Sequence, residues 1–244
     1  MPPAEPSPPH ALPLVFEGVC LEAGGKTLLA DVVCRIEAGG TSVLLGPNGA
    51  GKSLWIGIAA GLRQPTGGRL RWLGEGAAAG PRCAIVRQRP VLLRRSVRAN
   101  LAYPLGLRRV PRQLAHARIE RVLGAARLRE LAERPARSLS VGEQQRVALA
   151  RAWVLAPEVL FMDEPAASLD PGATAALESA VSALAEEGSK LVVATHDLAQ
   201  ARRMASDVLF LHRGRLLEHT PAAEFFNEPR SIEARKFLAG EILT

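Results

Sequence analysis

The stretch Thr41-Ser-Val-Leu-Leu-Gly46-Pro-Asn-Gly-Ala-Gly-Lys52-Ser53 decides the fold of this chain. Its first part is mainly apolar and is typical of a buried β-strand, and the part from Gly46 matches the pattern G-x-x-x-x-G-K-[ST]. Glycines let such a loop wrap tightly, so that backbone N–H groups and the start of the next helix point at phosphate oxygens. The stretch predicts a strand, a phosphate-binding loop and a helix after Ser53.

We expect the loop to bind the phosphates of a nucleotide. Lys52 would neutralise the β- and γ-phosphates and contribute to catalysis, and Ser53 would ligate Mg²⁺. The predicted nucleotide-binding residues here are Gly46, Pro47, Asn48, Gly49, Ala50, Gly51, Lys52, Ser53 and Leu54. The alternative is a glycine-rich turn that binds nothing, which the full match and its strand-to-helix setting disfavour.

A pair of acids follows a second apolar run, Val159 to Met162. Asp163 and Glu164 stand at the carboxyl end of this predicted strand, where α/β sheets place their ligands. Asp163 would hold the metal ion and Glu164 would polarise the attacking water as a general base. The alternative is a solvated acidic pair at the end of a strand.

The stretch from Leu139 to Arg146, LSVGEQQR, has two interpretations. Ser140 and Glu143 have the capping-box spacing S-x-x-E, which by itself indicates only the start of a helix. A cap does not require Gly142 in the first turn, whereas a close approach of phosphate to the backbone does. The stretch also resembles the signature of the ATP-binding-cassette (ABC) family, usually written LSGGQ, although Val141 and Glu143 depart from it.

Further motifs resemble the family in the same order, over residues 14–217. The resemblance implies that Gln88, after the predicted strand Ala84 to Val86, ligates the metal and links it to a helical lobe. It implies a loop at Ser168-Leu169-Asp170 and a catalytic switch histidine at His196. It also implies that Ser140, Gly142 and Glu143 bind nucleotide, so that two copies pair head to tail with ATP between them.

The resemblance further implies a location and partners. It indicates an ATPase that powers an importer from the cytoplasmic face of the inner membrane, bound peripherally to integral-membrane permease subunits, with an extracytoplasmic solute-binding protein as an indirect partner. Residues 87–96, 210–218 and 234–243 resemble importers of oxyanions such as tungstate or molybdate. Importers of phosphate or amino acids, an exporter half, and a non-transport ABC ATPase acting on nucleic acid are the alternatives.

The predicted fold class is α/β: a P-loop NTPase core with a mainly parallel sheet, an N-terminal antiparallel β portion and an inserted helical subdomain. We expect a disordered proline-rich tail over residues 1–13 and one domain over 14–244. The core covers 14–90 and 155–220, the helical subdomain about 91–154, and two C-terminal helices 221–244. Thr220 before Pro221 and Ser231 before Ile232 are helix-start signals.

Composition narrows the function classes. The net charge of +7 comes mostly from arginines spread along the chain, with loose groups such as Arg94-Arg95-Arg98 and Arg108-Arg109-Arg112 but no concentrated basic tail. The chain also lacks basic stretches with the interleaved aromatic residues that stack on bases, so no direct nucleic-acid binding is expected. Cys20, Cys34 and Cys83 fit reduced, buried thiols better than a disulfide frame or a metal site. No apolar run approaches the length of about 20 residues that a membrane-spanning helix needs.

One departure from the family concerns the nucleotide base. The family's adenine-stacking aromatic residue aligns with Ala23, in Glu22-Ala23-Gly24-Gly25. Either base selectivity is weak or Phe16 takes over the stacking. The absence of the ring predicts that GTP is used nearly as well as ATP.

Overall fold

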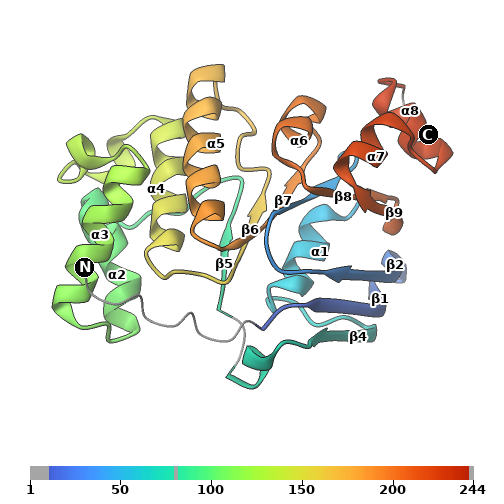
Figure 1. Ribbon diagram of the computed structural model, residues 1–244, viewed down its shortest axis with the longest axis horizontal. Helices are drawn as coiled ribbons and strands as arrows, with labels where there is room; N and C mark the ends of the chain where they lie inside the picture. The colour runs from blue at the N-terminus through green and yellow to red at the C-terminus, as the bar shows by residue number, and fades with distance from the viewer. Residues whose placement is uncertain (1–10, 80–81, 242–244) are drawn as a thin grey trace.

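The computed structural model describes residues 11–79 and 82–241 and is built around a six-stranded sheet (Figure 1). The strand order is β5-β6-β7-β3-β8-β9, and all neighbours are parallel except the β8–β9 hairpin. The strands are β3 Thr41–Leu45, β5 Cys83–Val86, β6 Val159–Asp163, β7 Lys190–Thr195, β8 Asp207–His212 and β9 Arg215–Pro221. This confirms the predicted α/β class with a mainly parallel sheet.

A second, antiparallel sheet has the order β2-β1-β4. Its strands are β1 Leu14–Ala23, β2 Lys26–Ile36 and β4 Gly67–Trp72, and the predicted turn at Gly24 and Gly25 joins the first two. Between the two sheets lies α1 (Lys52–Ala59), whose apolar side chains share one core with residues of both. The phosphate loop is therefore fixed between two sheets.

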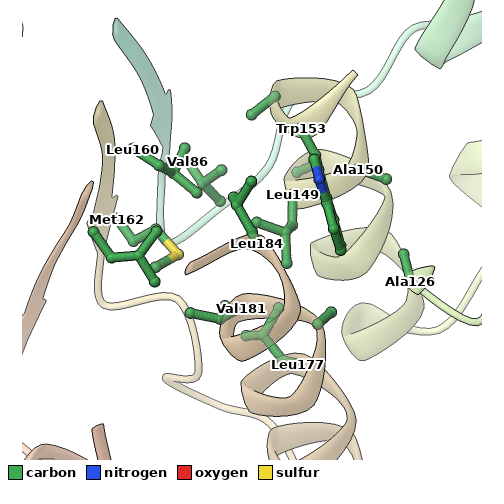
Figure 2. Close-up of a cluster of buried hydrophobic side chains, with 14 of the residues drawn as sticks. Val86, Ala126, Leu149, Ala150, Trp153, Leu160, Met162, Leu177, Val181 and Leu184 are labelled. Carbon is green, nitrogen blue, oxygen red and sulfur yellow. The ribbon is translucent and has the colours of Figure 1, made fainter. Parts of the chain in front are cut away.

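The helices α2 (Val97–Leu107), α3 (Arg112–Ala125) and α4 (Val141–Trp153) gather at one end of the molecule (Figure 1). Short 3₁₀ helices lie at Glu75–Ala79, Arg129–Leu131 and Ala136–Ser138. Figure 2 shows that Trp153 and Leu149 of α4 lie beside Leu177 and Leu184 of α5 (Pro171–Glu186), with Met162 of β6 in the same cluster. The helical region and the sheet thus share one core, so the start of α4 has a fixed position relative to the acids at the end of β6.

The C-terminal part contains α6 (Leu198–Met204), α7 (Ala222–Asn227) and α8 (Ile232–Leu238). Ser231 caps α8 by accepting a hydrogen bond from the Ala234 backbone N–H, as predicted. The helix start predicted at Thr220 was wrong by one residue. Thr220 is buried in β9, and Pro221 is the N-cap of α7 rather than its first helical residue. Pairing with β8 holds this segment extended, which overrides the proline signal.

A partly buried charged cluster joins the strands at the opposite edge of the sheet. Asp207 accepts hydrogen bonds from the Ser42 hydroxyl at 2.8 Å and lies 2.8 Å from His219 Nε2 and 3.6 Å from Lys190 Nζ. Lys190 is 3% exposed and also donates to the Gly39 carbonyl. The cluster ties β3, β7, β8 and β9 together.

The expected disordered tail over residues 1–13 includes residues that pack into the fold. Residues 1–10 lie outside the described residues, but Ala11 and Leu12 are buried, and their backbone N–H groups donate to Glu158 Oε1. Among the described residues, no helix is long and apolar enough to cross a membrane. The cysteines are unpaired thiols, and burial raises the pKa of Cys34 and Cys83 to about 12, so both stay protonated at neutral pH.

Candidate functional site

A cavity of about 640 Å³ lies where the phosphate loop meets the carboxyl ends of β6 and β7. In the strand order β3 neighbours β7, and β7 neighbours β6, so residues far apart in sequence meet at this edge. The residues that line it are Asn48, Gly49, Gly51, Lys52, Ser53, Leu54, Gln88, Asp163, Glu164, Ala167, Ser168 and His196.

The phosphate loop turns into α1 at Gly51. This residue has φ 107°, a region that side-chain-bearing residues rarely adopt, and a Cβ there would lie 2.8 Å from Leu29 Cδ2. The helix begins directly after it, at Lys52. Ser53 and Leu54 belong to the first turn, whose backbone N–H groups have no partner within the helix, and both residues line the cavity. A helix N-terminus that opens into a cavity in this way can bind an anion.

Lys52 is held by the loop that it serves. Its Nζ donates to the carbonyls of Gly46 at 2.8 Å and Pro47 at 3.1 Å, and lies 3.3 Å from Glu164 Oε1. Burial lowers the pKa of Lys52 below its usual value, while the nearby Glu164 carboxylate acts in the opposite direction. A phosphate group would replace Glu164 as the counter-charge of a lysine that is only 5% exposed.

Glu164 sits in a strained backbone conformation. Its φ is 46°, uncommon for a residue other than glycine, and its N–H donates to the Ala194 carbonyl of β7. One carboxylate oxygen, Oε1, lies 3.3 Å from Lys52 Nζ and 3.1 Å from His196 Nδ1. The turn after β6 thus directs the carboxylate to a point between the phosphate loop and the histidine after β7.

Three oxygen-bearing side chains in the cavity suit a magnesium ion. Asp163 Oδ1 is buried and has no hydrogen-bond partner, and Ser53 and Gln88 line the same cavity. A carboxylate, a hydroxyl and an amide oxygen are the hard ligands that Mg²⁺ prefers, and this ion needs few protein ligands because it keeps several waters. In the described part of the chain, no group of three or more His, Cys, Asp or Glu residues could hold a metal ion. A Mg²⁺ ion at Asp163 would therefore also need the hydroxyl of Ser53, the amide of Gln88 and water as ligands.

The predicted signature lies at the start of α4 and not in the cavity. Ser140 and Glu143 form a complete capping box: the Glu143 N–H donates to Ser140 Oγ at 3.3 Å, and the Ser140 N–H donates to Glu143 Oε2 at 2.8 Å. This backbone hydrogen bond lowers the pKa of Glu143. Ser140 and Val141 are exposed at the tip of the helix, so another molecule can reach them.

Gly142 has a structural reason that the sequence did not reveal. It is buried, and a Cβ at this position would lie 2.6 Å from the Cβ of Ala173 on α5. Phosphate contact is therefore not the only explanation of this glycine, because close packing of α4 on α5 requires it as well. The expectation that Phe16 stacks on a base was also wrong: its side chain is fully buried and stacks on Trp55 at 4.5 Å between ring centroids.

The cavity thus brings together most of the predicted residues of the loop with Gln88, Asp163, Glu164 and His196. Gly46 and Pro47 contribute carbonyls to Lys52 instead of lining it, and Ala50 is buried. Two lining residues, Ala167 and Ser168, were absent from the predicted set. The signal for Ser168 was its motif with Leu169 and Asp170, whereas Ala167 offers no chemical signal at all.

The fold and this cavity define a P-loop nucleoside triphosphatase. A family profile described as "ABC transporter" matches residues 29–167, more than half of the chain. The chain is 35% identical to the phosphate import ATP-binding protein PstB 2 of Natronomonas pharaonis, over 94% of this chain and 87% of that protein. It belongs to the ABC transporter family, and it is an ATPase in which ATP hydrolysis is coupled to transport.

Other relatives agree with this assignment. The histidine transport ATP-binding protein HisP of Pseudomonas aeruginosa is 34% identical over 94% of this chain and 98% of its own length. The tungstate uptake system ATP-binding protein TupC of Peptoclostridium acidaminophilum is 34% identical over 80% and 92%. The solved structure of cbiO1 from Clostridium perfringens superposes with a TM-score of 0.80 at 26% identity, covering 88% of this chain and 90% of that one. The chain is the ATPase subunit of an ABC importer.

Proposed function

We propose that the chain powers the uptake of an oxyanion, with tungstate or molybdate as the first candidates. It acts as a head-to-tail homodimer on integral-membrane permease subunits at the cytoplasmic face of the membrane, and a solute-binding protein delivers the cargo from outside. The observation that carries the motor part of this proposal is the separation of the cavity from the exposed tip of α4.

The dimer follows from what one copy lacks. No residue of the signature lines the cavity, yet Ser140 and Val141 are exposed at a helix N-terminus. The capping box uses the N–H groups of Ser140 and Glu143, and those of Val141 and Gly142 have no partner within the helix. A second copy can place that helix end against the γ-phosphate, whose negative charge the positive end of the helix dipole favours. ATP then closes the dimer, and loss of the γ-phosphate opens it.

Within the cavity, each side chain has a distinct task. Lys52 leaves Glu164 for the incoming phosphates, which frees the carboxylate to accept a proton from the attacking water. His196, 3.1 Å from the same carboxylate, holds it in position through Nδ1. Ser53, Gln88 and Asp163 are the residues that would hold Mg²⁺, which supplies neutralisation of the phosphate charge when bound.

The dimer can be tested directly. We expect the Glu164→Gln chain to elute as a dimer with Mg-ATP and as a monomer without it, measured by light scattering after gel filtration. Ser140→Arg in that background keeps the protein monomeric, whereas Ser140→Thr, which retains a capping hydroxyl, leaves dimerisation intact. A chain that binds ATP tightly and never dimerises would remove the head-to-tail arrangement.

The proposed cargo rests on the names of relatives and on the resemblance of two sequence segments to oxyanion importers. Two of the three relatives described above carry oxyanions in their names, phosphate and tungstate. Residues 87–96 and 210–218 resemble importers of tungstate-type anions. Histidine transport by the third relative supports polar amino acids as the second candidate.

A reconstituted transporter decides between the cargoes. The chain is purified with its permease, and ATP hydrolysis is measured as the solute-binding protein is added empty or loaded with tungstate, molybdate, phosphate or histidine. Stimulation by tungstate or molybdate alone supports the proposal. Stimulation by histidine and by neither metal oxyanion would contradict the cargo while leaving the motor assignment intact.

A further inference from the structure

The positive charge of this chain is concentrated in one segment, which contains both of the loose arginine groups named above. Residues 76–119 contain no Asp or Glu. The same residues include ten arginines, namely Arg82, Arg87, Arg89, Arg94, Arg95, Arg98, Arg108, Arg109, Arg112 and Arg118. Because the whole chain has a net charge of +7, the remainder is slightly acidic, so one region dominates its field.

The most exposed part of this segment is the connection between α2 and α3. We call Leu107, Arg108, Arg109, Arg112 and Leu114 the arginine tip. All five are exposed, Leu107 by 68% and Leu114 by 42%, which is unusual for leucine beside charged residues. Within residues 11–79 and 82–241, no side-chain ion pair or hydrogen bond is formed by the three arginines of the tip.

The fold itself does not account for all of these charges. Arg108 and Arg109 follow the C-terminus of α2, where positive charge is favourable. Arg112, however, is the first residue of α3, whose first turn contains no acid, and positive charge at a helix N-terminus is unfavourable. Arg98 provides the contrast, since it pairs with Glu120 and Glu133 inside the same lobe. The tip therefore offers charge to a partner outside the chain.

We propose that the arginine tip binds the anionic headgroups of membrane phospholipids, with Leu107 and Leu114 at the level of the headgroups. Exposed leucines flanking unpaired arginines are the pattern of a surface that lies on an anionic membrane. An acidic loop of the permease is the other partner of suitable charge. Cytoplasmic loops of membrane proteins carry an excess of Lys and Arg, which would repel the tip, so the lipid is favoured.

This proposal goes beyond the transport function and does not depend on the cargo. It is tested on the full chain by co-sedimentation with vesicles of phosphatidylcholine, with or without about 30% of the anionic lipid phosphatidylglycerol, which supplies the negative surface potential. The test variant carries Arg108→Gln, Arg109→Asn and Arg112→Gln, with asparagine at 109 because that residue has φ 52°. None of these residues lines the nucleotide cavity, so ATP hydrolysis in solution stays unchanged and reports on folding.

A matched control removes the same charge elsewhere. Arg63, Arg69 and Arg215 are exposed and, within the described residues, form no side-chain ion pair, so their triple change to Gln alters net charge equally. Each arginine near an anionic surface raises partitioning about five-fold, so the tip variant loses roughly a hundred-fold in affinity for the anionic vesicles. The control loses far less, and wild-type binding disappears in high salt.

Three results would overturn the proposal. The first is wild-type chain that does not sediment with anionic vesicles at low salt. The second is equal loss in the tip and control variants, which would indicate net charge alone. The third is unchanged vesicle binding by the tip variant together with loss of co-purification with the permease, which would assign the tip to an acidic protein surface. We also expect Leu107→Ser to weaken vesicle binding, because the proposal places this leucine at the level of the headgroups. Unchanged binding by Leu107→Ser would remove the leucine from the contact.

Discussion

Substitution of Gly142 by alanine separates two explanations of the signature glycine. The new Cβ would lie 2.6 Å from the Cβ of Ala173, about 1 Å closer than a normal carbon–carbon contact. Neither atom can rotate away, so α4 and α5 must move apart, and overpacking of this kind costs about 1–3 kcal/mol. The helix propensity of alanine returns up to about 1 kcal/mol of this. We expect a net loss of roughly 1–2 kcal/mol in the free energy of unfolding.

The assay is thermal and urea unfolding of the single and double variants. A loss of 1 kcal/mol lowers the Tm of a chain of this size by about 2–4 °C. Adding Ala173→Gly removes the opposing methyl group, so the double variant recovers most of the stability, with a coupling energy of about 1–2 kcal/mol. Wild-type stability in Gly142→Ala, or no relief from Ala173→Gly, would refute the packing argument. A double variant that regains stability but not ATP hydrolysis would show that the backbone at 142 also meets phosphate.

Three further outcomes are expected. Glu164→Gln binds ATP yet hydrolyses it about 10²–10⁴-fold more slowly, as loss of a general base predicts; near-normal turnover in a steady-state assay would remove Glu164 from that role. GTP supports hydrolysis within roughly ten-fold of ATP in kcat/KM, because no ring replaces the aromatic residue at Ala23, and a large preference for ATP would count against this. Asp207→Asn destabilises the fold by roughly 3 kcal/mol at pH 7 because it leaves Lys190 buried without its carboxylate. Burial alone would raise the pKa of Asp207, but the His219 hydrogen bond, the Lys190 charge and the Ser42 hydroxyl lower it below 3.8. The stabilisation by the Asp207 carboxylate is therefore present above pH 3.8, the pKa of an unperturbed Asp, and is lost as the pH falls through the lower pKa of Asp207 in the folded state. The urea midpoints of the variant and the wild type should converge only below about pH 4.

The site was predictable where one residue type is required by chemistry. Lys52, Asp163 and Glu164 follow buried strands in a fixed pattern, and that pattern placed them at one edge of the sheet. Features that arise from packing were not predictable. The contact between Gly142 and Ala173, the burial of Phe16 against Trp55 and the anchoring of residues 11 and 12 by Glu158 join segments that are distant in sequence.

Secondary structure shows the same division. Strand Thr41–Leu45 was predicted with its bounds because it is mainly apolar and lies between clear turn signals. Helix α6, Leu198–Met204, was missed because it is short and lies between two buried strands. The proline signal at 221 failed because sheet pairing with β8 holds that segment extended.

The central place of β3 has a consequence for synthesis of the protein. This strand leaves the ribosome early, but its two neighbours in the sheet, β7 and β8, begin at residues 190 and 207. Until both emerge, the phosphate loop is attached to a strand with unpaired edges, the kind of exposed template that nascent chains must shield from one another. Capture of ATP therefore has to be one of the last events in the maturation of the chain, and a ligand added to stalled, shorter nascent chains should protect them poorly from proteolysis.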